Sequence, residues 1–375
     1  MTSLYIHIPF CKQKCNYCDF VSYAGKEHLI DEYVEALCRE IRSQPATRDS
    51  LASSEVERRL ATIYFGGGTP TLLEPRHFDK IIKNLNSSFV IRNSEFTIES
   101  NPGTTDLAKL KALRSLGINR LSIGVQSFND KHLSTLGRIH NASEAIKFYE
   151  DARTAGFDNI NLDLMFALPG QTLEEWKRDL HTALDLGPEH LSTYNLQIEE
   201  GTPLWERMKQ PSPDSLKTLT LSQRERVLRA GTFSPWEKVR VLSKSDEGIR
   251  FPSEEEELTM YKYTIETLTA AGYKHYEISN FAKAGFECRH NINYWKNGSF
   301  IGIGTGAKSQ IIPDERNTIF LGLRLLEGLP VENFAGYEKE VAGLINDGLL
   351  ERNNGHYKLT RQGLYLGNLV FEKFV

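Results

Sequence analysis

Residues 4–18 read LYIHIPFCKQKCNYC, an apolar strand pattern that runs directly into three closely spaced cysteines. Cys11, Cys15 and Cys18 fall within eight residues, so pairwise disulfides would leave one of them over, whereas all three can face one metal centre. Clustered thiolates select zinc or iron–sulfur clusters. A structural zinc site usually takes a fourth Cys or His at similar range, and His7 has the wrong spacing for that role. The pattern therefore favours an iron–sulfur cluster with one iron open to an outside ligand.

Strand and helix patterns alternate through the first two hundred residues. The expected strands are Leu4–Ile8, Thr62–Phe65, Glu95–Glu99, Arg120–Val125, Ile160–Phe166 and Leu191–Ile198. The expected helices are Leu29–Ile41, His77–Leu85, Thr105–Leu116, Ala142–Ala155 and Leu173–Leu186. Six such units indicate an open doubly wound sheet or an incomplete barrel, and periodicity does not choose between them. In both folds the functional groups lie at the carboxyl ends of the strands.

The rest of the chain is organised differently. Residues 206–252 lose the alternation and carry ten Lys/Arg against six Asp/Glu, which predicts a solvated, partly disordered insertion. A helix is expected from Glu254 to Ala271. The tail from Asp314 combines helical patterns, a β-ribbon over 348–360 and a last helix over Leu364–Phe374. Helices with a terminal β-wing suggest a small winged-helix-like domain.

Composition excludes several classes of protein. The chain has 375 residues, of which 40% are hydrophobic, and 45 Lys/Arg against 49 Asp/Glu give a net charge of −4. This balance argues against a nucleic-acid-binding tail. No apolar stretch approaches the roughly 18–20 residues of a membrane helix. The cysteine motif begins within about ten residues, which leaves no room for a signal peptide, so we expect a cytoplasmic location. Five cysteines without a secretion signal also argue against a disulfide framework.

A second motif, Gly66-Gly67-Gly68-Thr69-Pro70, directly follows the second expected strand. Glycines at a strand end let backbone groups approach a ligand closely, although a tight turn alone explains such a run equally well. Further motifs occupy 98–103, 120–128, 136–138 and 162–172. Together with the cysteine loop they resemble the radical S-adenosylmethionine (SAM) superfamily. The resemblance is to the branch of oxygen-independent coproporphyrinogen III dehydrogenase and HemW-type heme chaperones.

The resemblance covers residues 3–205 almost continuously and implies an α/β fold with an incomplete (β/α)6 barrel over 1–205. It further implies an insertion over 206–252, a helical extension over 253–313 and a winged-helix-like domain over 314–375. Cys11, Cys15 and Cys18 would ligate a 4Fe–4S cluster, whose open iron would take the amino and carboxylate groups of SAM. The resemblance assigns the SAM site to Tyr5, Tyr17, Gly67, Gly68, Thr69, Glu99, Gln126, Arg138 and Asp163. From the residues alone, Glu99 and Asp163 could instead cap helices or form salt bridges.

Two features discriminate within this branch. The dehydrogenases carry a further Cys two residues after the third ligand, where this chain has Phe20, and an N-terminal extension, whereas ten residues precede Cys11 here. His290-Asn291-Ile292-Asn293-Tyr294-Trp295 has the His-Asn-x-x-Tyr-Trp form that the resemblance links to heme binding. The candidate heme residues are His290, Tyr294 and Trp295, with Cys288 and His275 as alternative iron ligands. A core turn with a hydrogen-bonded His is the competing interpretation.

The expected function is therefore heme binding and delivery to client hemoproteins, respiratory ones among them, with a 4Fe–4S cluster, SAM and heme as cargo. The alternative is a coproporphyrinogen III dehydrogenase that decarboxylates propionates by radical chemistry. A DNA-binding regulator is a third class, but residues 314–375 are not clearly basic and no nucleic-acid partner is expected. A homodimer and transient membrane association stay open. The chain departs from the family in its long 206–252 insertion, in its short link over 310–313 and at Lys308, where a His is common.

Overall fold

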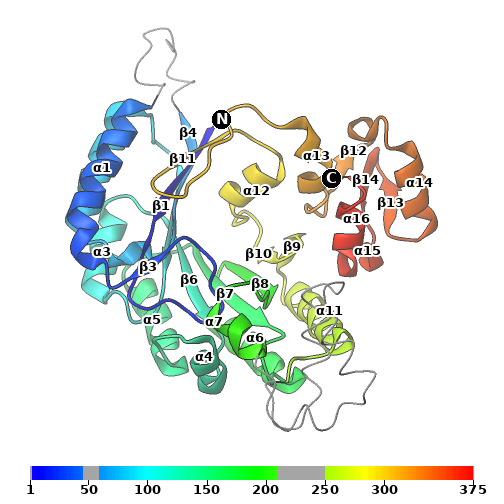
Figure 1. Cartoon of the computed structure of the whole chain (residues 1–375), viewed down its shortest axis with the longest axis horizontal. Coiled ribbons are helices and arrows are strands. Elements are labelled where there is room, and N and C mark those ends of the chain that lie inside the picture. The colour runs from blue at the N-terminus through cyan, green and yellow to red at the C-terminus, as the bar shows by residue number, and fades with distance from the viewer. Residues whose placement is uncertain (1, 45–58, 210–249, 375) are drawn as a thin grey trace.

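A computed structural model describes residues 2–44, 59–209 and 250–374. Its centre is a sheet in which six parallel strands follow one another in chain order (Figure 1). These strands are β1 (Thr2–Ile8), β4 (Leu60–Gly67), β5 (Glu95–Ser100), β6 (Arg120–Gln126), β7 (Ile160–Phe166) and β8 (His190–Asn195). All six expected strands are present, and their order confirms the incomplete six-stranded barrel.

Three further strands, which the sequence did not predict, extend both edges of this sheet. β11 (Phe300–Ile303) pairs in parallel with β1, with Leu4 opposite Ile301. β10 (Asn280–Ala282) runs antiparallel to β8, and β9 (Lys274–Glu277) lies outside β10. The segment expected as a helical extension therefore contributes strands to the barrel as well as two helices, α11 (Glu254–Ala270) and α12 (Arg289–Trp295).

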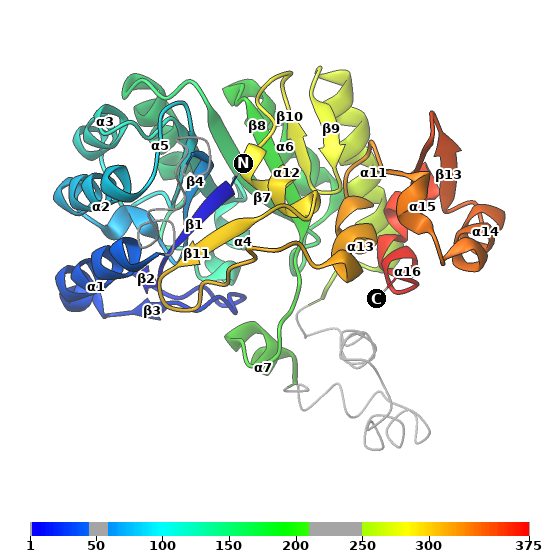
Figure 2. The ribbon, with the colours of Figure 1, turned by 90° about the horizontal axis from the view of Figure 1, so that it is seen from above.

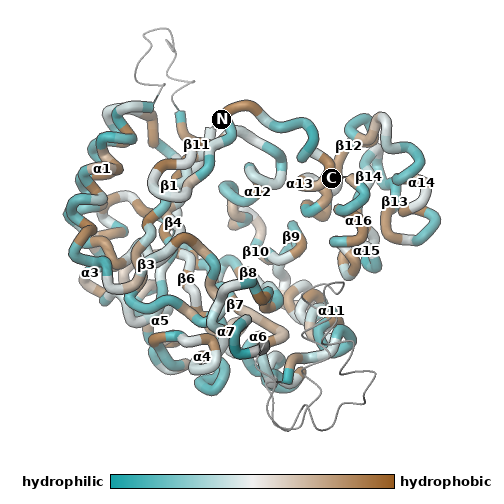
Figure 3. The backbone as a smooth tube through the Cα atoms, in the orientation of Figure 1, coloured by the Kyte–Doolittle hydropathy of each residue, from teal (hydrophilic) through white to brown (hydrophobic). Residues whose placement is uncertain are grey.

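Helices cover the outer face of the sheet (Figure 2). They are α1 (Ile30–Ser43), α2 (Pro75–Ser88), α3 (Leu107–Ser115), α5 (Ala142–Thr154) and α6 (Leu173–Leu186). Two shorter helices, α4 (Asp130–Leu136) and α7 (Pro203–Lys209), share a separate apolar cluster, and α7 lies apart from the sheet (Figure 2). In Figure 3 the α1 ribbon alternates between hydrophilic and hydrophobic residues, because only one of its faces is buried. Helix α11 packs against α6, and the Trp176 indole nitrogen donates to Thr264 Oγ1 at 2.9 Å.

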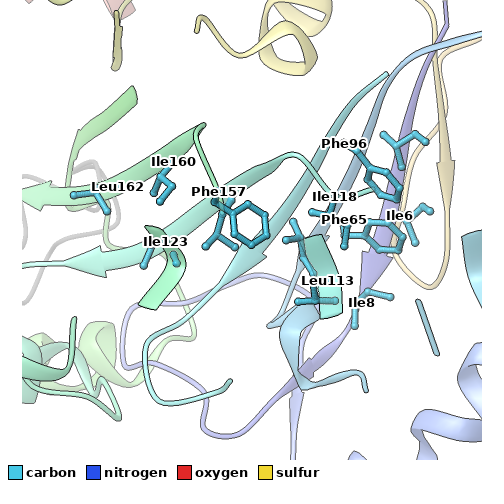
Figure 4. Packing of buried hydrophobic residues seen from close by; sticks show 14 of the residues in the cluster. Ile6, Ile8, Phe65, Phe96, Leu113, Ile118, Ile123, Phe157, Ile160 and Leu162 are labelled. Carbon is cyan, nitrogen blue, oxygen red and sulfur yellow. The ribbon is translucent and has the colours of Figure 1, made fainter. Parts of the chain in front are cut away.

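Successive residues of each parallel strand serve two different layers, because side chains alternate across a sheet. Ile6, Phe65 and Ile123 point outward and pack under the helices in one continuous apolar core (Figure 4). Their neighbours Tyr64 and Ser122 line the barrel interior. The outward layer stabilises the fold, and the inward layer is left free for polar chemistry.

The C-terminal part is a small unit with its own apolar core. It combines a three-stranded antiparallel sheet, ordered β12-β14-β13, with short helices. Its strands are β12 (Leu329–Pro330), β13 (Leu350–Asn353) and β14 (His356–Leu359), and its helices are α13 (Thr318–Gly322), α14 (Glu338–Asn346), α15 (Arg361–Tyr365) and α16 (Gly367–Phe371). The expected β-ribbon is present. The last helix was expected to be continuous, but Leu366 leaves the helical region at φ −117° and ψ 29° and divides it in two.

Two further predictions concern the connections. The insertion predicted over 206–252 lies largely outside the described residues, apart from the end of α7 and residues 250–252. The short link over 310–313 leaves Ile311 and Ile312 exposed. None of the described helices is both long enough and apolar enough to span a membrane.

Candidate functional site

The cysteine loop lies at the carboxyl end of β1 and is held in place by its backbone. The short strand β2 (Phe10–Cys11) pairs with β3 (Tyr23–Ala24), which closes the loop. Asn16 ties the loop to the rest of the barrel, because its backbone N–H donates to Leu136 O at 2.9 Å. Backbone hydrogen bonds therefore fix the loop that carries the three cysteines.

Two polar groups contact the cysteine sulfurs. The Thr69 hydroxyl donates to Cys11 Sγ at 3.7 Å, and the Arg138 guanidinium donates to Cys15 Sγ at 3.3 Å. Burial raises the pKa of both the Cys11 and the Cys18 thiols. Thiols in such surroundings need a nearby cation to ionise, and a soft metal centre supplies one. The donor set and its guanidinium fit a thiolate-ligated cluster. Within the described ranges, no three His, Cys, Asp or Glu side chains gather closely enough to hold a single metal ion.

The glycine turn after β4 has no room for side chains. Gly67 has φ +114°, and a Cβ there would lie 2.6 Å from His7 Cε1. A Cβ on Gly68 would lie 2.6 Å from Phe10 O. His7 is itself fixed, since Nε2 bonds Val21 O at 2.8 Å and Nδ1 bonds the Tyr5 hydroxyl at 3.1 Å. The glycines bring the turn against the cysteine loop, and His7 supports that loop from the barrel interior.

Glu99 lies at the end of β5 and faces the glycine turn. Its carboxylate accepts from the Tyr64 hydroxyl at 2.8 Å and from the Gly67 backbone N–H at 3.1 Å. Burial is the main cause that raises the pKa of Glu99 from 4.5 to about 7, and the charge of Asp163 adds to the effect. A cationic ligand beside this carboxyl would favour its ionised form.

The other polar residues expected at the site line the same end of the barrel. Arg138 also donates to Asn101 Oδ1 and Gly124 O, both at 2.5 Å. Gln126 follows a register shift in β6 and has φ +70°, an unusual conformation for a residue with a side chain, and Tyr194 donates to its Oε1 at 3.0 Å. Asp163 accepts from Asn161 at 2.8 Å.

The two expected tyrosines also lie here. Burial raises the pKa of both Tyr5 and Tyr17 well above 10, so both keep their phenolic protons. The Glu99 charge adds to the rise in the pKa of Tyr5, and the Arg138 charge opposes the rise in the pKa of Tyr17. Each tyrosine therefore lies near one of these two charged residues. The structure thus brings the residues expected for SAM to one end of the barrel.

The His-Asn-x-x-Tyr-Trp motif forms α12, which closes the barrel between β11 and the β9–β10 hairpin (Figure 1). The Glu95 carboxylate accepts the backbone N–H groups of Arg289 and His290, each at 3.1 Å, and so holds the first turn of this helix. The sequence reading treated Glu95 only as the start of a strand.

His290 points into the barrel core. Its side chain is 1% exposed, Nδ1 bonds the Thr62 hydroxyl at 2.7 Å, and Nε2 bonds the Tyr294 hydroxyl at 3.1 Å. Burial lowers the pKa of His290 to about 3, so the ring is neutral. The ring also stacks on Tyr64 at 4.9 Å between centroids. In this conformation both ring nitrogens are engaged, as the competing interpretation of a hydrogen-bonded core His expects.

Of the two alternative iron ligands, Cys288 is buried and His275 is half-buried. Cys288 Sγ lies 3.8 Å from Glu95 Oε1, and burial raises the pKa of this thiol to about 12. The His275 ring stacks on Phe281 at 4.2 Å, and its Nε2 bonds Ile278 O at 3.2 Å. Trp295, by contrast, lines a cavity and lies under the Arg324 guanidinium, 4.3 Å from the ring centroid.

This cavity, which the sequence reading missed, has a volume of about 280 Å³ inside the barrel. It reaches from Tyr64 and Asp163 to Trp295, and its other walls include Arg120, which is 2% exposed, and Arg324. Arg120 could have been singled out in the sequence because it is an arginine at the start of a mostly apolar strand. Nothing local to the sequence brings Arg324 to the barrel.

Comparisons with known proteins show which families the chain matches. Residues 5–183 match the family model described as "Radical SAM superfamily", and residues 316–366 match "HemN C-terminal domain". The chain is 34% identical to the heme chaperone HemW of Bacillus subtilis, with 100% of this chain and 99% of the relative covered. It is 33% identical to HemW of Lactococcus lactis, with 100% and 97% covered.

Among solved structures, the fold is similar to coproporphyrinogen III oxidase (HemN) from Escherichia coli, a radical SAM enzyme, with a TM-score of 0.71. The two chains are 23% identical, and the match covers 100% of this chain and 89% of the other. At this identity the likeness concerns the fold alone.

Proposed function

Because this chain belongs to the radical SAM superfamily and is HemW-like over its full length, we propose that it binds heme and delivers it to client hemoproteins. The observation that carries the proposal is the near-complete coverage of relatives named heme chaperones, at 33–34% identity. The radical SAM family implies a 4Fe–4S cluster and SAM, with heme as the cargo.

The cluster would be held by Cys11, Cys15 and Cys18. When bound, a 4Fe–4S cluster with SAM supplies reductive cleavage of the sulfonium. This chain's own residues anchor the cysteine loop, direct the Arg138 guanidinium and the Thr69 hydroxyl onto two of the sulfurs, and exclude solvent from Cys11.

SAM would occupy the end of the barrel between the glycine turn and the charged residues that face it. Glu99 would take the cationic side of the cofactor, since its buried carboxyl gains most from a positive neighbour. The backbone at Gly67 and Gly68 would lie against the methionyl part. The remaining contacts would come from Tyr5, Tyr17, Thr69, Gln126, Arg138 and Asp163.

Heme contact would involve the side of α12 that borders the cavity. Trp295 borders the cavity, whereas His290 and Tyr294 hydrogen-bond each other inside the barrel. We therefore assign His290 a positioning role in this conformation, in which it holds α12 against β4 through Thr62. An iron ligand from His290, Cys288 or His275 would need a rearrangement of α12 or of the β9–β10 hairpin.

Further parts of the proposal concern organisation and setting. We propose domain limits of 1–205, 206–252, 253–313 and 314–375, a cytoplasmic location and hemoprotein clients without a nucleic-acid partner. A transient membrane contact and a homodimer would be compatible with delivery to respiratory clients.

The test uses the full chain with its cluster reconstituted anaerobically. Titration with heme should give saturable binding by absorbance, and the loaded protein should transfer heme to an apo-hemoprotein faster than free heme inserts. The same preparation is then given reductant, SAM and coproporphyrinogen III, and protoporphyrinogen is measured by mass spectrometry. Repeated turnover to protoporphyrinogen would overturn the proposal in favour of the dehydrogenase. Absence of both saturable heme binding and turnover would exclude both functions.

A further inference from the structure

The barrel cavity is lined by buried polar atoms that lack hydrogen-bond partners. Among the described residues, three of these atoms are N–H donors, on Arg120 (Nε), Trp295 (Nε1) and Arg324 (Nε), and two are acceptors, Asn280 Oδ1 and Glu277 Oε2. A buried polar atom without a partner costs about 1–3 kcal/mol. Several such atoms around one cavity indicate a place that is built to receive a polar ligand.

Arg120 is the most informative of these residues. Its side chain is 2% exposed, and its guanidinium makes no hydrogen bond or ion pair within the described part of the chain. The nearby acid Glu95 is committed to the first turn of α12. A guanidinium stays charged when buried, and a buried charge is stable only when an anion or strong acceptors accompany it. The cavity beside Arg120 is where such an anion can enter.

A second cation borders the cavity from the C-terminal unit. Arg324 lies over the Trp295 ring, and its Nη2 is 3.6 Å from Glu277 Oε2. Glu277 Oε1 accepts from the Ser279 backbone N–H at 2.9 Å and from the Asn280 amide. Arg324 is the cation beside Oε2, which has no hydrogen bond within the described ranges. Asp163, the other acid in the wall, accepts from Asn161 and Ser122. The Glu95 charge acts on Arg120, but the Arg120 Nε–H has no hydrogen-bond acceptor among the described residues.

We propose that this cavity is a carboxylate-binding subsite in which Arg120, assisted by the Trp295 indole N–H, receives one propionate of the heme cargo. The inference rests on the proposed function. Guanidinium and indole N–H groups both donate, which matches the acceptor-only chemistry of a carboxylate. Arg324 also lines the cavity, and its Nε–H can add a further donor.

Size favours a side chain of the tetrapyrrole over the whole ring. The cavity of about 280 Å³ lies just below the range of roughly 300–1,000 Å³ that ligand pockets usually span. A propionate therefore fits inside the barrel while the macrocycle stays outside it, beside α12 and the C-terminal unit.

The carboxylate of SAM is the other source of the same chemistry. SAM is expected at the carboxyl ends of the strands, where β6 ends at Gln126, whereas Arg120 is the first residue of that strand. Six residue steps along a strand correspond to roughly 20 Å, which sets Arg120 back from the strand end. Asp163 and Tyr64 line the cavity as well, so it adjoins the SAM region, and the experiment has to separate the two sources of carboxylate.

The experiment compares heme with heme dimethyl ester, whose propionates carry no charge, on the cluster-loaded full chain. Dissociation constants are measured by absorbance for the wild type, Arg120→Gln, Arg324→Gln and the surface control Arg352→Gln. The wild type and the control should bind heme about ten- to hundred-fold more tightly than the ester. Arg120→Gln should lose most of this preference and keep its affinity for the ester. Arg324→Gln, in a different element, should lose part of it.

The outcomes separate this inference from the proposed function. Equal affinity of the wild type for heme and ester, or an equal loss of both in Arg120→Gln, would overturn the propionate subsite while leaving heme binding intact. Absence of binding to either compound would overturn the proposed function itself. SAM affinity is measured in parallel by calorimetry, and a fall there with unchanged heme binding would assign Arg120 to the cofactor and overturn the inference. If Arg120→Gln does not fold, Arg324→Gln tests the inference instead: a partial loss of the preference for heme over the ester supports it, and an unchanged preference overturns it.

Discussion

Replacement of Glu99 by Gln should change how the stability of the SAM-free protein depends on pH. Burial and the neighbouring Asp163 charge raise the pKa of Glu99 in the folded state from 4.5 to about 7. The folded protein therefore holds this proton more tightly than the unfolded chain does. The stabilisation that this provides is complete below pH 4.5 and is lost as the pH rises through 7.

The magnitude follows from the shift. Each pKa unit corresponds to about 1.4 kcal/mol, so a shift from 4.5 to about 7 amounts to roughly 3 kcal/mol. The Gln variant keeps the side chain's shape, carries no titrating proton and can still accept from Tyr64. Relative to this variant, the wild type should lose about 3 kcal/mol of unfolding free energy between pH 4.5 and pH 8.

The assay is urea unfolding at four pH values across this interval, with the Glu99→Gln variant and the wild type measured side by side. The difference between them removes the contribution of all other titrating groups. Glu200→Gln, at an exposed position, serves as the control for removal of a surface charge. A wild-type-minus-Glu99→Gln difference that stays constant within 0.5 kcal/mol would refute the reasoning, because it would mean that the carboxyl is not desolvated.

Two further substitutions test the packing of the site. Gly67→Ala should destabilise the chain by about 2–5 kcal/mol, because φ +114° is strained for alanine and the new Cβ displaces His7 from Tyr5 and Val21. Thermal unfolding measures the loss, and an unchanged Tm would contradict this expectation. Thr62→Val is nearly isosteric but leaves His290 Nδ1 unpaired, and should cost about 1–3 kcal/mol in urea unfolding; a neutral result would mean that His290 has another partner.

The strands of the barrel could be predicted where their signal is local. The run Ile160–Phe166 was expected with the bounds that β7 has, because its outward residues are continuously apolar and its flanks break the pattern. The glycines and cysteines of the site were found in the same way, since each motif is contiguous and its spacing reflects its chemistry.

The remainder depends on contacts between distant parts of the chain. β9 and β10 are short and include polar residues such as Lys274 and Asn280, and they are strands because β8 offers them an edge. The cavity likewise needs Arg120 from β6 and Arg324 from the C-terminal unit, which lie about two hundred positions apart. No local stretch of the sequence shows that these two arginines line one cavity, because the fold alone brings them together.

The pairing of β1 with β11 also bears on how the chain is made. The outer partner of β1, residues 300–303, is synthesised almost three hundred residues after β1 itself. At about 5–20 residues per second, that edge waits roughly 15–60 s for its partner during translation. An unpaired strand edge is a template for wrong pairing between chains. Nascent chains of this protein should therefore depend on ribosome-associated chaperones until β11 has emerged and covered the edge.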